Sequence, residues 1–189
     1  MQEGDVSADR RRVQEDEYFR RRDQELIERQ QRLAEVAAER RLIAQAIGVD
    51  HDEIVLDLQM AGYRADTIVL LELTPSVQVA WADGRVSTHE RELLLQIAAR
   101  EHVAQNSPAH VQLDTWLDRP PSDHLFGTSL RALRDTLDSL QPDVRASLRR
   151  KLISDCATIA TASGGLLSRG HYMSKEEQQV IERIVGELS

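Results

Sequence analysis

A short pattern that occurs twice constrains the fold of this chain more than any other feature of its sequence. In the first copy, residues 79–90, an apolar run ends at Asp83 and Gly84. Gly84 can adopt the left-handed backbone that ends a helix, because it has no Cβ. Ser87 then precedes Glu90 by three residues, which is the spacing of a capping box at a helix start. The first copy therefore predicts a helix, a glycine turn and a second helix that begins after Ser87.

The second copy lies near the end of the chain. Residues 159–165 repeat the end of the first helix, so that Gly164 aligns with Gly84, and Ser174 precedes Glu177 by three residues. The apolar residues that follow keep the same offsets: Leu93, Leu94, Ile97 and Ala98 correspond to Val180, Ile181, Ile184 and Val185. We interpret the pattern as a diverged internal duplication of a helix–turn–helix unit. Two unrelated helical hairpins are the alternative, because capping boxes and glycine stops are common.

The composition favours an all-α protein, which we expect to be a compact helical bundle. Hydrophobic residues make up 41% of the 189 residues and charged residues 30%, whereas aromatic residues make up only 4%. No stretch alternates with the period of two that a half-buried strand shows. The net charge of −8 argues against a nucleic-acid partner. No apolar run is long enough for a transmembrane segment, no secretory signal is visible, and the single cysteine fits a cytoplasmic location.

The first 47 residues are predicted to form a long, charged and partly protruding helix, separate from a bundle of residues 48–189. Residues 10–47 contain neither Pro nor Gly and would span roughly 57 Å as a helix. Phe19, Leu26 and Leu33 recur every seven residues and are the candidate interaction residues. Arginines stand where a coiled-coil seam needs apolar residues, so the pattern indicates at best a weak coiled coil. Acidic residues interleave the arginine triplets, which favours a solvated face over a nucleic-acid or lipid site.

Further capping and breaking residues divide the bundle into helices. Asp50 and Asp66 are predicted to start the two helices before the first copy of the repeat. Pro75 is expected either to kink the second of these helices or to restart it. After the first copy, Ser107 and Ser122 are predicted N-caps of two more helices.

The Ala-Asp-Gly-Arg-Val run of residues 82–86, followed by Glu90, resembles the TerB-like family, named for bacterial tellurite-resistance proteins. The resemblance covers residues 70–188. It implies a compact all-α bundle, and family members are tied to stress responses, phage defence, and metal-linked or membrane-linked complexes. Many members have a weaker second copy of the motif. Here Ser163 replaces the Asp of the second copy, which speaks against a symmetric pair of acidic sites.

The same loop has part of the pattern of an EF-hand calcium loop. Five residues match it: Asp83, Gly84, Val86, Ser87 and Glu90. The two leading ligand positions are Val79 and Trp81, which supply no carboxylate. Asp83 and Glu90 are therefore candidate ligands of a weakly held divalent cation such as calcium. The alternative, which we favour, is that Asp83 ends a helix and Glu90 completes the capping box.

Two hypotheses of function follow, and neither assigns an enzymatic activity or a firm cofactor. No paired acid and base or activated nucleophile is evident, and Cys156 lies on an apolar stripe as a small hydrophobic residue. The first hypothesis is a non-enzymatic bacterial TerB-like interaction module in a stress-response or defence complex. Its N-terminal helix would bind a protein partner or self-associate into a homo-oligomer. The alternative is a metal-responsive protein that binds a divalent cation at Asp83 and Glu90.

Overall fold

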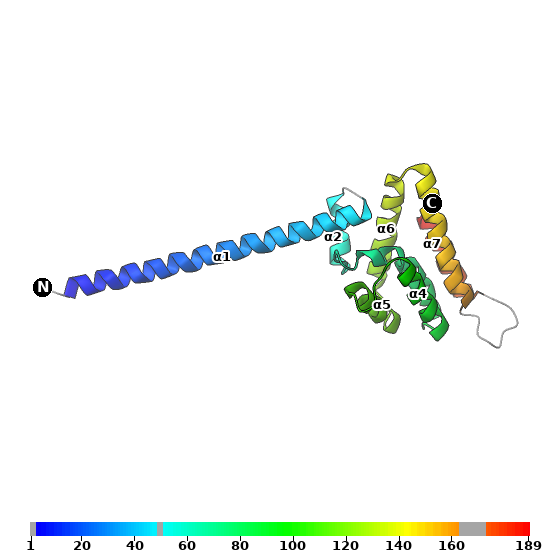
Figure 1. The fold of residues 1–189 in the computed structure, drawn as a ribbon, viewed down its shortest axis with the longest axis horizontal. Helices are drawn as coiled ribbons and strands as arrows, with labels where there is room; N and C mark the ends of the chain where they lie inside the picture. The colour runs from blue at the N-terminus through cyan, green and yellow to red at the C-terminus, as the bar shows by residue number, and fades with distance from the viewer. Residues whose placement is uncertain (1–2, 49–50, 163–172) are drawn as a thin grey trace. The chain divides into compact units, whose positions relative to one another are not determined.

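A computed structural model describes residues 3–48, 51–162 and 173–189, which form eight α-helices, one 3-10 helix and no strand (Figure 1). In chain order the elements are α1 (Glu3–Ile47), α2 (Asp52–Met60), η1 (Ile68–Glu72), α3 (Thr74–Ala80), α4 (Thr88–Arg100), α5 (Pro108–Asp118), α6 (Asp123–Ser139), α7 (Pro142–Ala162) and α8 (Lys175–Glu187). The predicted all-α fold is confirmed.

The chain forms two compact units, residues 1–41 and 42–189. The first unit is helix α1 up to Arg41, and its side chains from residue 17 to residue 38 are exposed. The end of α1 belongs to the second unit, where Ile43 and Ile47 are buried in the core. The sequence-based division after residue 47 follows the end of the helix, whereas the compact unit already begins at Leu42.

The two copies of the repeat form the hairpins α3–α4 and α7–α8, which pack against each other. Helix α3 packs against α7 and α8, and α7 packs against α4 as well as α8. Each first helix therefore contacts both helices of the other hairpin. Aligned residues also share burial: Val79 and Ile159 are both buried completely. This reciprocal packing is what two hairpins related by an approximate two-fold axis would produce.

Helix α6 and the remaining short helices complete the core. Helix α6 packs against α2, α3, α7 and α8, and α5 packs against η1. Tyr63 fixes one junction, because its hydroxyl lies 2.6 Å from Thr74 Oγ1 and 2.8 Å from Ser129 Oγ. Burial outweighs these hydrogen bonds and raises the pKa of Tyr63 to about 12. Tyr63 therefore remains a neutral, hydrogen-bonded core residue.

Four predicted serine N-caps are confirmed by their hydrogen bonds. The hydroxyl oxygens of Ser87, Ser107, Ser122 and Ser174 each accept a bond from the backbone N–H three residues later, at 3.3, 3.2, 3.2 and 3.1 Å. Ser87 and Ser174 form complete capping boxes. These local signals worked because the cap and its partner lie within one helical turn.

Other local predictions need correction. Helix α2 begins at Asp52, with His51 at the N-cap position and no side-chain cap bond, while Asp50 lies outside the described residues. Asp66 caps no α-helix, because the segment after it is the short 3-10 helix η1, with Thr67 at its N-cap position.

Pro75 restarts the chain rather than kinking one helix. It lies in the first turn of α3, after η1 has ended at Glu72. A proline is favourable in a first turn because the N–H it lacks has no partner inside the helix there.

Candidate functional site

The turn between α3 and α4 holds the residues predicted to bind a metal. Helix α3 ends at Ala80, so Gly84 does not directly follow the helix end as predicted. Gly84 instead lies within the following turn, at φ 86°, and its N–H donates to the Trp81 carbonyl at 2.9 Å. Asp83 stabilises the same turn, since its Oδ1 accepts a bond from the Arg85 N–H at 3.1 Å. This pattern is an Asx turn, a structural role for Asp83.

Glu90 is a buried carboxylate inside its capping box. Its side chain is 2% exposed, and its Oε2 accepts a bond from the Ser87 N–H at 2.7 Å. Burial raises the pKa of Glu90; hydrogen bonds from Ser87 oppose the rise, and the negative charges of Asp83 and Glu177 add to it. The carboxylate is therefore stabilised by its backbone hydrogen bond, whereas burial and two nearby negative charges disfavour its ionised form.

Glu177 has the same arrangement in the second copy. It is 1% exposed, and its Oε2 accepts a bond from the Ser174 N–H at 2.6 Å. The structure thus brings together the buried capping-box glutamates of both copies, close enough for their charges to interact. Ser163 and Gly164, aligned with Asp83 and Gly84, lie outside the described residues.

The two leading ligand positions of the calcium-loop pattern, which lack carboxylates, are held by side chains that pack within the fold. Val79 is completely buried in α3, and the Trp81 indole N–H donates to the Trp116 carbonyl at 2.8 Å. His89, next to Glu90, is exposed, with its Nδ1 4.0 Å from Glu92 Oε2. In the described part of the chain, no group of three or more His, Cys, Asp or Glu side chains could hold a metal ion.

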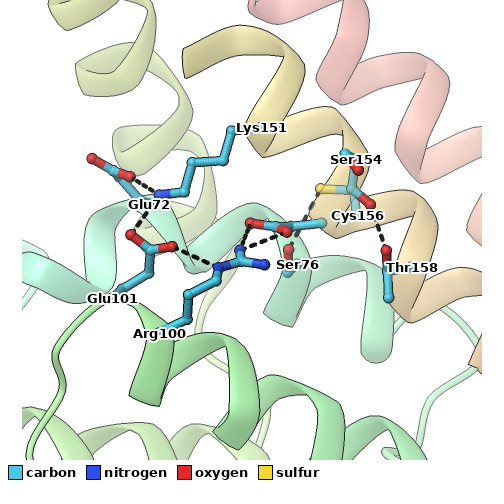
Figure 2. A network of polar contacts seen from close by, with 9 residues as sticks. Glu72, Ser76, Arg100, Glu101, Lys151, Ser154, Cys156 and Thr158 are labelled. Atoms are coloured by element: carbon cyan, nitrogen blue, oxygen red, sulfur yellow. Dashed lines mark hydrogen bonds and ion pairs between the residues drawn. The ribbon is translucent and has the colours of Figure 1, made fainter. Parts of the chain in front are cut away.

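A network of charged side chains, absent from the sequence-based predictions, joins η1, α4 and α7 (Figure 2). The Lys151 ammonium bridges Glu72 Oε2 at 2.6 Å and Glu101 Oε2 at 2.7 Å. The Arg100 guanidinium contacts Glu101 Oε1 at 3.2 Å and both oxygens of Asp155 at 2.8 Å. Five charged groups therefore form one continuous chain of ion pairs.

In this network, the ion pairs together shift the pKa values of Glu101 and Lys151 more than burial does. Burial opposes ionisation of Glu101, but hydrogen bonds from Lys151 and Arg100 lower the pKa of Glu101 overall. Burial likewise disfavours the ammonium of Lys151, but bonds to Glu101 and Glu72 raise its pKa. The one local signal was the four-residue spacing of Lys151 and Asp155, which places both on one face of α7. Their partners come from distant segments, which no spacing could identify.

A small cavity adjoins the network. It has a volume of about 240 Å³, and Glu72 and Glu101 lie at its wall together with mainly apolar side chains from α1, η1, α6 and α7. Both carboxylates already pair with the Lys151 ammonium. Cys156 does not supply a reactive thiolate to this cavity, because its side chain is completely buried and burial raises the pKa of its thiol to about 12.

The predicted interaction residues lie along one face of α1. Phe19, Leu26 and Leu33 are 61%, 53% and 62% exposed. Seven residues make almost two full helical turns, so these three side chains line up about 10 Å apart. The Phe19 ring also contacts Tyr18 edge to face, with ring centres 5.9 Å apart. The first unit therefore presents a row of large apolar side chains that its other residues leave exposed.

Comparisons with protein-family models, with curated proteins and with solved structures find no match to this chain. None of the described helices combines the length and apolar character needed to cross a bilayer.

Proposed function

We propose that this protein is a TerB-like interaction module that binds a protein partner through helix α1. The observation that carries the proposal is the exposed row of Phe19, Leu26 and Leu33. Exposed side chains of this size, aligned on one helix face, are typical anchors for a helix-in-groove or helix-pair interface. The resemblance of residues 82–90 to the TerB-like motif supports a bacterial, cytoplasmic stress-response or defence complex. The proposal assigns no reaction to the protein.

The charges between the apolar residues favour a different protein over a second copy. Arg22 and Arg29 occupy the alternate seam positions of the seven-residue pattern. In a parallel pair of identical helices, each arginine would face its own copy, and like charges in a seam destabilise it. A partner helix with carboxylates at those positions would neutralise both arginines. Self-association into a homo-oligomer is the outcome that the experiment must distinguish.

A tagged full-length chain, used as bait in extracts of the native cell, tests this proposal. Leu26→Ser should lose the captured partner, whereas Ile27→Ser should retain it. The two side chains are matched, because they are adjacent and 53% and 54% exposed, but only Leu26 lies in the seven-residue row. A chain without residues 1–32 should behave like Leu26→Ser. Equal capture by all four chains would contradict the proposal, and concentration-dependent sedimentation of the purified chain would favour self-association.

A divalent cation at Asp83 and Glu90 is the second candidate function. The observation that favours it is the electrostatic interaction of Glu90 with both Asp83 and Glu177. Burial is the main cause of the raised pKa of Glu90, and a bound cation would offset the smaller repulsion from the two neighbouring carboxylates. The hydrogen bonds of Asp83 and Glu90 to the backbone favour the structural role instead.

A further inference from the structure

The exposed row of Phe19, Leu26 and Leu33 on α1 also fits a second copy of the same helix, if that copy runs in the opposite direction. Arg22 and Arg29 disfavour a second copy when the two helices are parallel, because each seam residue then faces its own copy. Reversing one helix changes the residue that each seam position faces. The direction of the pair therefore decides whether the arginines meet.

One antiparallel register gives every seam position a different partner. The row residues alternate along the seam with Arg22, Arg29 and Val36, each three residues further on. When Phe19 faces Val36 of the second copy, the same register sets Leu26 against Arg29 and Leu33 against Arg22. Each layer of the seam then holds at least one apolar side chain, and no layer holds two arginines.

The charges of α1 alternate in bands along the helix, and these bands favour the same direction. Residues 20–22 are all arginine, residues 23–28 carry three carboxylates and no base, and residues 29–32 carry two arginines and no acid. In a parallel pair in register, each band would lie level with its own copy. In the antiparallel register, the basic residues 29–32 lie level with residues 23–26 of the second copy, which include two carboxylates.

Glu25 and Arg32 supply a specific ion pair beside the seam. Each immediately precedes a leucine of the row, so both occupy the same flanking position of the seven-residue pattern, where interhelical salt bridges form. Like flanks meet in an antiparallel pair, so Glu25 of each copy approaches Arg32 of the other. Arg32 lies 4.0 Å from Glu28 of its own helix in an exposed pair, which is weak and leaves other N–H donors of the guanidinium available.

The segment that would pair is close to neutral, although the protein is acidic. Residues 17–41 contain seven arginines and six carboxylates, whereas the whole chain has a net charge of −8. Two copies of this segment therefore repel each other little. The self-pair is still weaker than a pair with a partner that offers carboxylates to Arg22 and Arg29, because in the self-pair these arginines face leucines.

We propose, on the basis of the proposed function of α1, that a second copy pairs antiparallel with α1 and covers the apolar row. The second copy and the partner protein then compete for one surface. The row is covered when the protein is concentrated and becomes available when a partner with better-matched charges displaces the second copy. Self-association thus regulates the interaction rather than replacing it.

Disulfide exchange between single-cysteine chains tests the direction of the pair. Full-length chains with Phe19→Cys or Val36→Cys, each in a Cys156→Ala background, are mixed in a glutathione redox buffer. In the antiparallel pair, position 19 lies level with position 36 of the other copy, and the two copies of position 19 are roughly 25 Å apart, too far for a disulfide. We expect the mixed dimer to exceed both homodimers combined. A predominance of dimers joined through position 19 alone would show a parallel pair and overturn the proposal.

Sedimentation equilibrium of the purified full-length chain tests the ion pair. Glu25→Arg turns two attractions into two repulsions and should weaken self-association by about tenfold. Adding Arg32→Glu to Glu25→Arg should restore the wild-type affinity within about threefold, which a loss of helix would not allow. Glu35→Arg is the matched control, because it makes the same charge change on the helix face opposite Leu26 and should alter the affinity by no more than about twofold. A chain that stays monomeric at every concentration, or a double variant that is not restored, would overturn the proposal.

A chemically locked pair tests whether the second copy covers the row. The chain with Glu25→Cys, Arg32→Cys and Cys156→Ala leaves the row intact and can be joined to a second copy with bismaleimidoethane. As bait in extracts of the native cell, the locked pair should lose the partner, whereas the same chain capped with N-ethylmaleimide should retain it. Equal capture by both baits would overturn the covering role. Failure of the proposed function itself gives a different result, because Leu26→Ser would then capture as much as the wild type.

Discussion

Ser76 Oγ and Cys156 Sγ lie 3.8 Å apart and are separated by 80 residues in the sequence (Figure 2). The same offset of 80 separates the aligned glycines Gly84 and Gly164. Equivalent residues of the two copies therefore touch where α3 packs on α7, as expected beside an approximate two-fold axis. Both side chains are small and buried, which allows the two helix backbones to approach closely.

The Cys156 thiol should report global unfolding. Because the side chain is completely buried and burial raises the pKa of its thiol to about 12, we expect almost no reaction with a disulfide reagent at pH 8 in the native protein. Reaction should follow the unfolding curve in urea. Ser154→Cys combined with Cys156→Ala supplies the control, because residue 154 is exposed on the same helix and should react at once. Rapid, complete reaction of the native wild type would contradict the burial of Cys156.

The capping serines should each contribute measurably to stability. Ser87→Ala and Ser174→Ala should each lower the free energy of unfolding by about 1 kcal/mol, because each removes an acceptor for an otherwise unpaired helix N–H. Urea denaturation measures the change. Ser154→Ala, an exposed position within α7, should change stability by no more than about 0.5 kcal/mol. If the two caps behave like this control, their hydrogen bonds are not stabilising.

Lys151→Met should destabilise the bundle by about 1 to 2 kcal/mol at neutral pH, because Glu72 and Glu101 would lose the ammonium that both contact. Arg150→Met is the matched control, since Arg150 is exposed on the same helix. Chemical denaturation at several pH values measures both variants.

The difference between wild type and Lys151→Met should depend on pH at both ends. Glu101 has a lowered pKa in the folded state, so its contribution is present above the ordinary value of 4.5 and is lost as pH falls through the folded pKa. Lys151 has a raised pKa, so its contribution is present below 10.5 and is lost as pH rises through the folded pKa. A pH-independent difference would show that the ion pairs contribute nothing.

A chain that starts at Leu33 should still fold, because the unit of residues 42–189 contains the buried end of α1. Circular dichroism and a thermal melt would show a cooperative transition. Ile43→Ala in the full chain should cost about 2 to 5 kcal/mol, since Ile43 is completely buried. Its neighbour Leu42 is 52% exposed, so Leu42→Ala should cost much less. An unfolded Leu33 chain would place the preceding helix inside the cooperative core.

Calcium distinguishes the two proposed functions, and we expect millimolar calcium or magnesium to leave the melting temperature unchanged. A site with a Kd of about 10⁻⁴ to 10⁻³ M would stabilise the fold by about 1.4 kcal/mol at ten times Kd, a visible rise. If a rise occurs and Asp83→Asn removes it, the turn is a cation site. A rise that persists in Asp83→Asn would place the cation elsewhere.

Local sequence signals determined much of the secondary structure. The serine caps could be predicted because each depends on groups within one helical turn. The left-handed backbone of Gly84 was also predicted, but the glycine lies within the turn and not at the end of α3. The row of Phe19, Leu26 and Leu33 was likewise visible from spacing alone. Asp66 and Pro75 show the limit of such signals, because an acidic residue or a proline is compatible with more than one helix start. The segment after Asp66 formed the short 3-10 helix η1, which packs against α5 and α6.

Only the tertiary structure decided which distant residues meet. It paired Ser76 with Cys156, placed the charges of Glu90 and Glu177 within range of each other, and joined Lys151 to carboxylates from two other elements. It also set Arg183 of α8 beside the arginines of α6. Periodicity identifies the face of a helix that is buried, but it does not identify the helix that covers that face. That choice depends on how all the apolar faces pack at once.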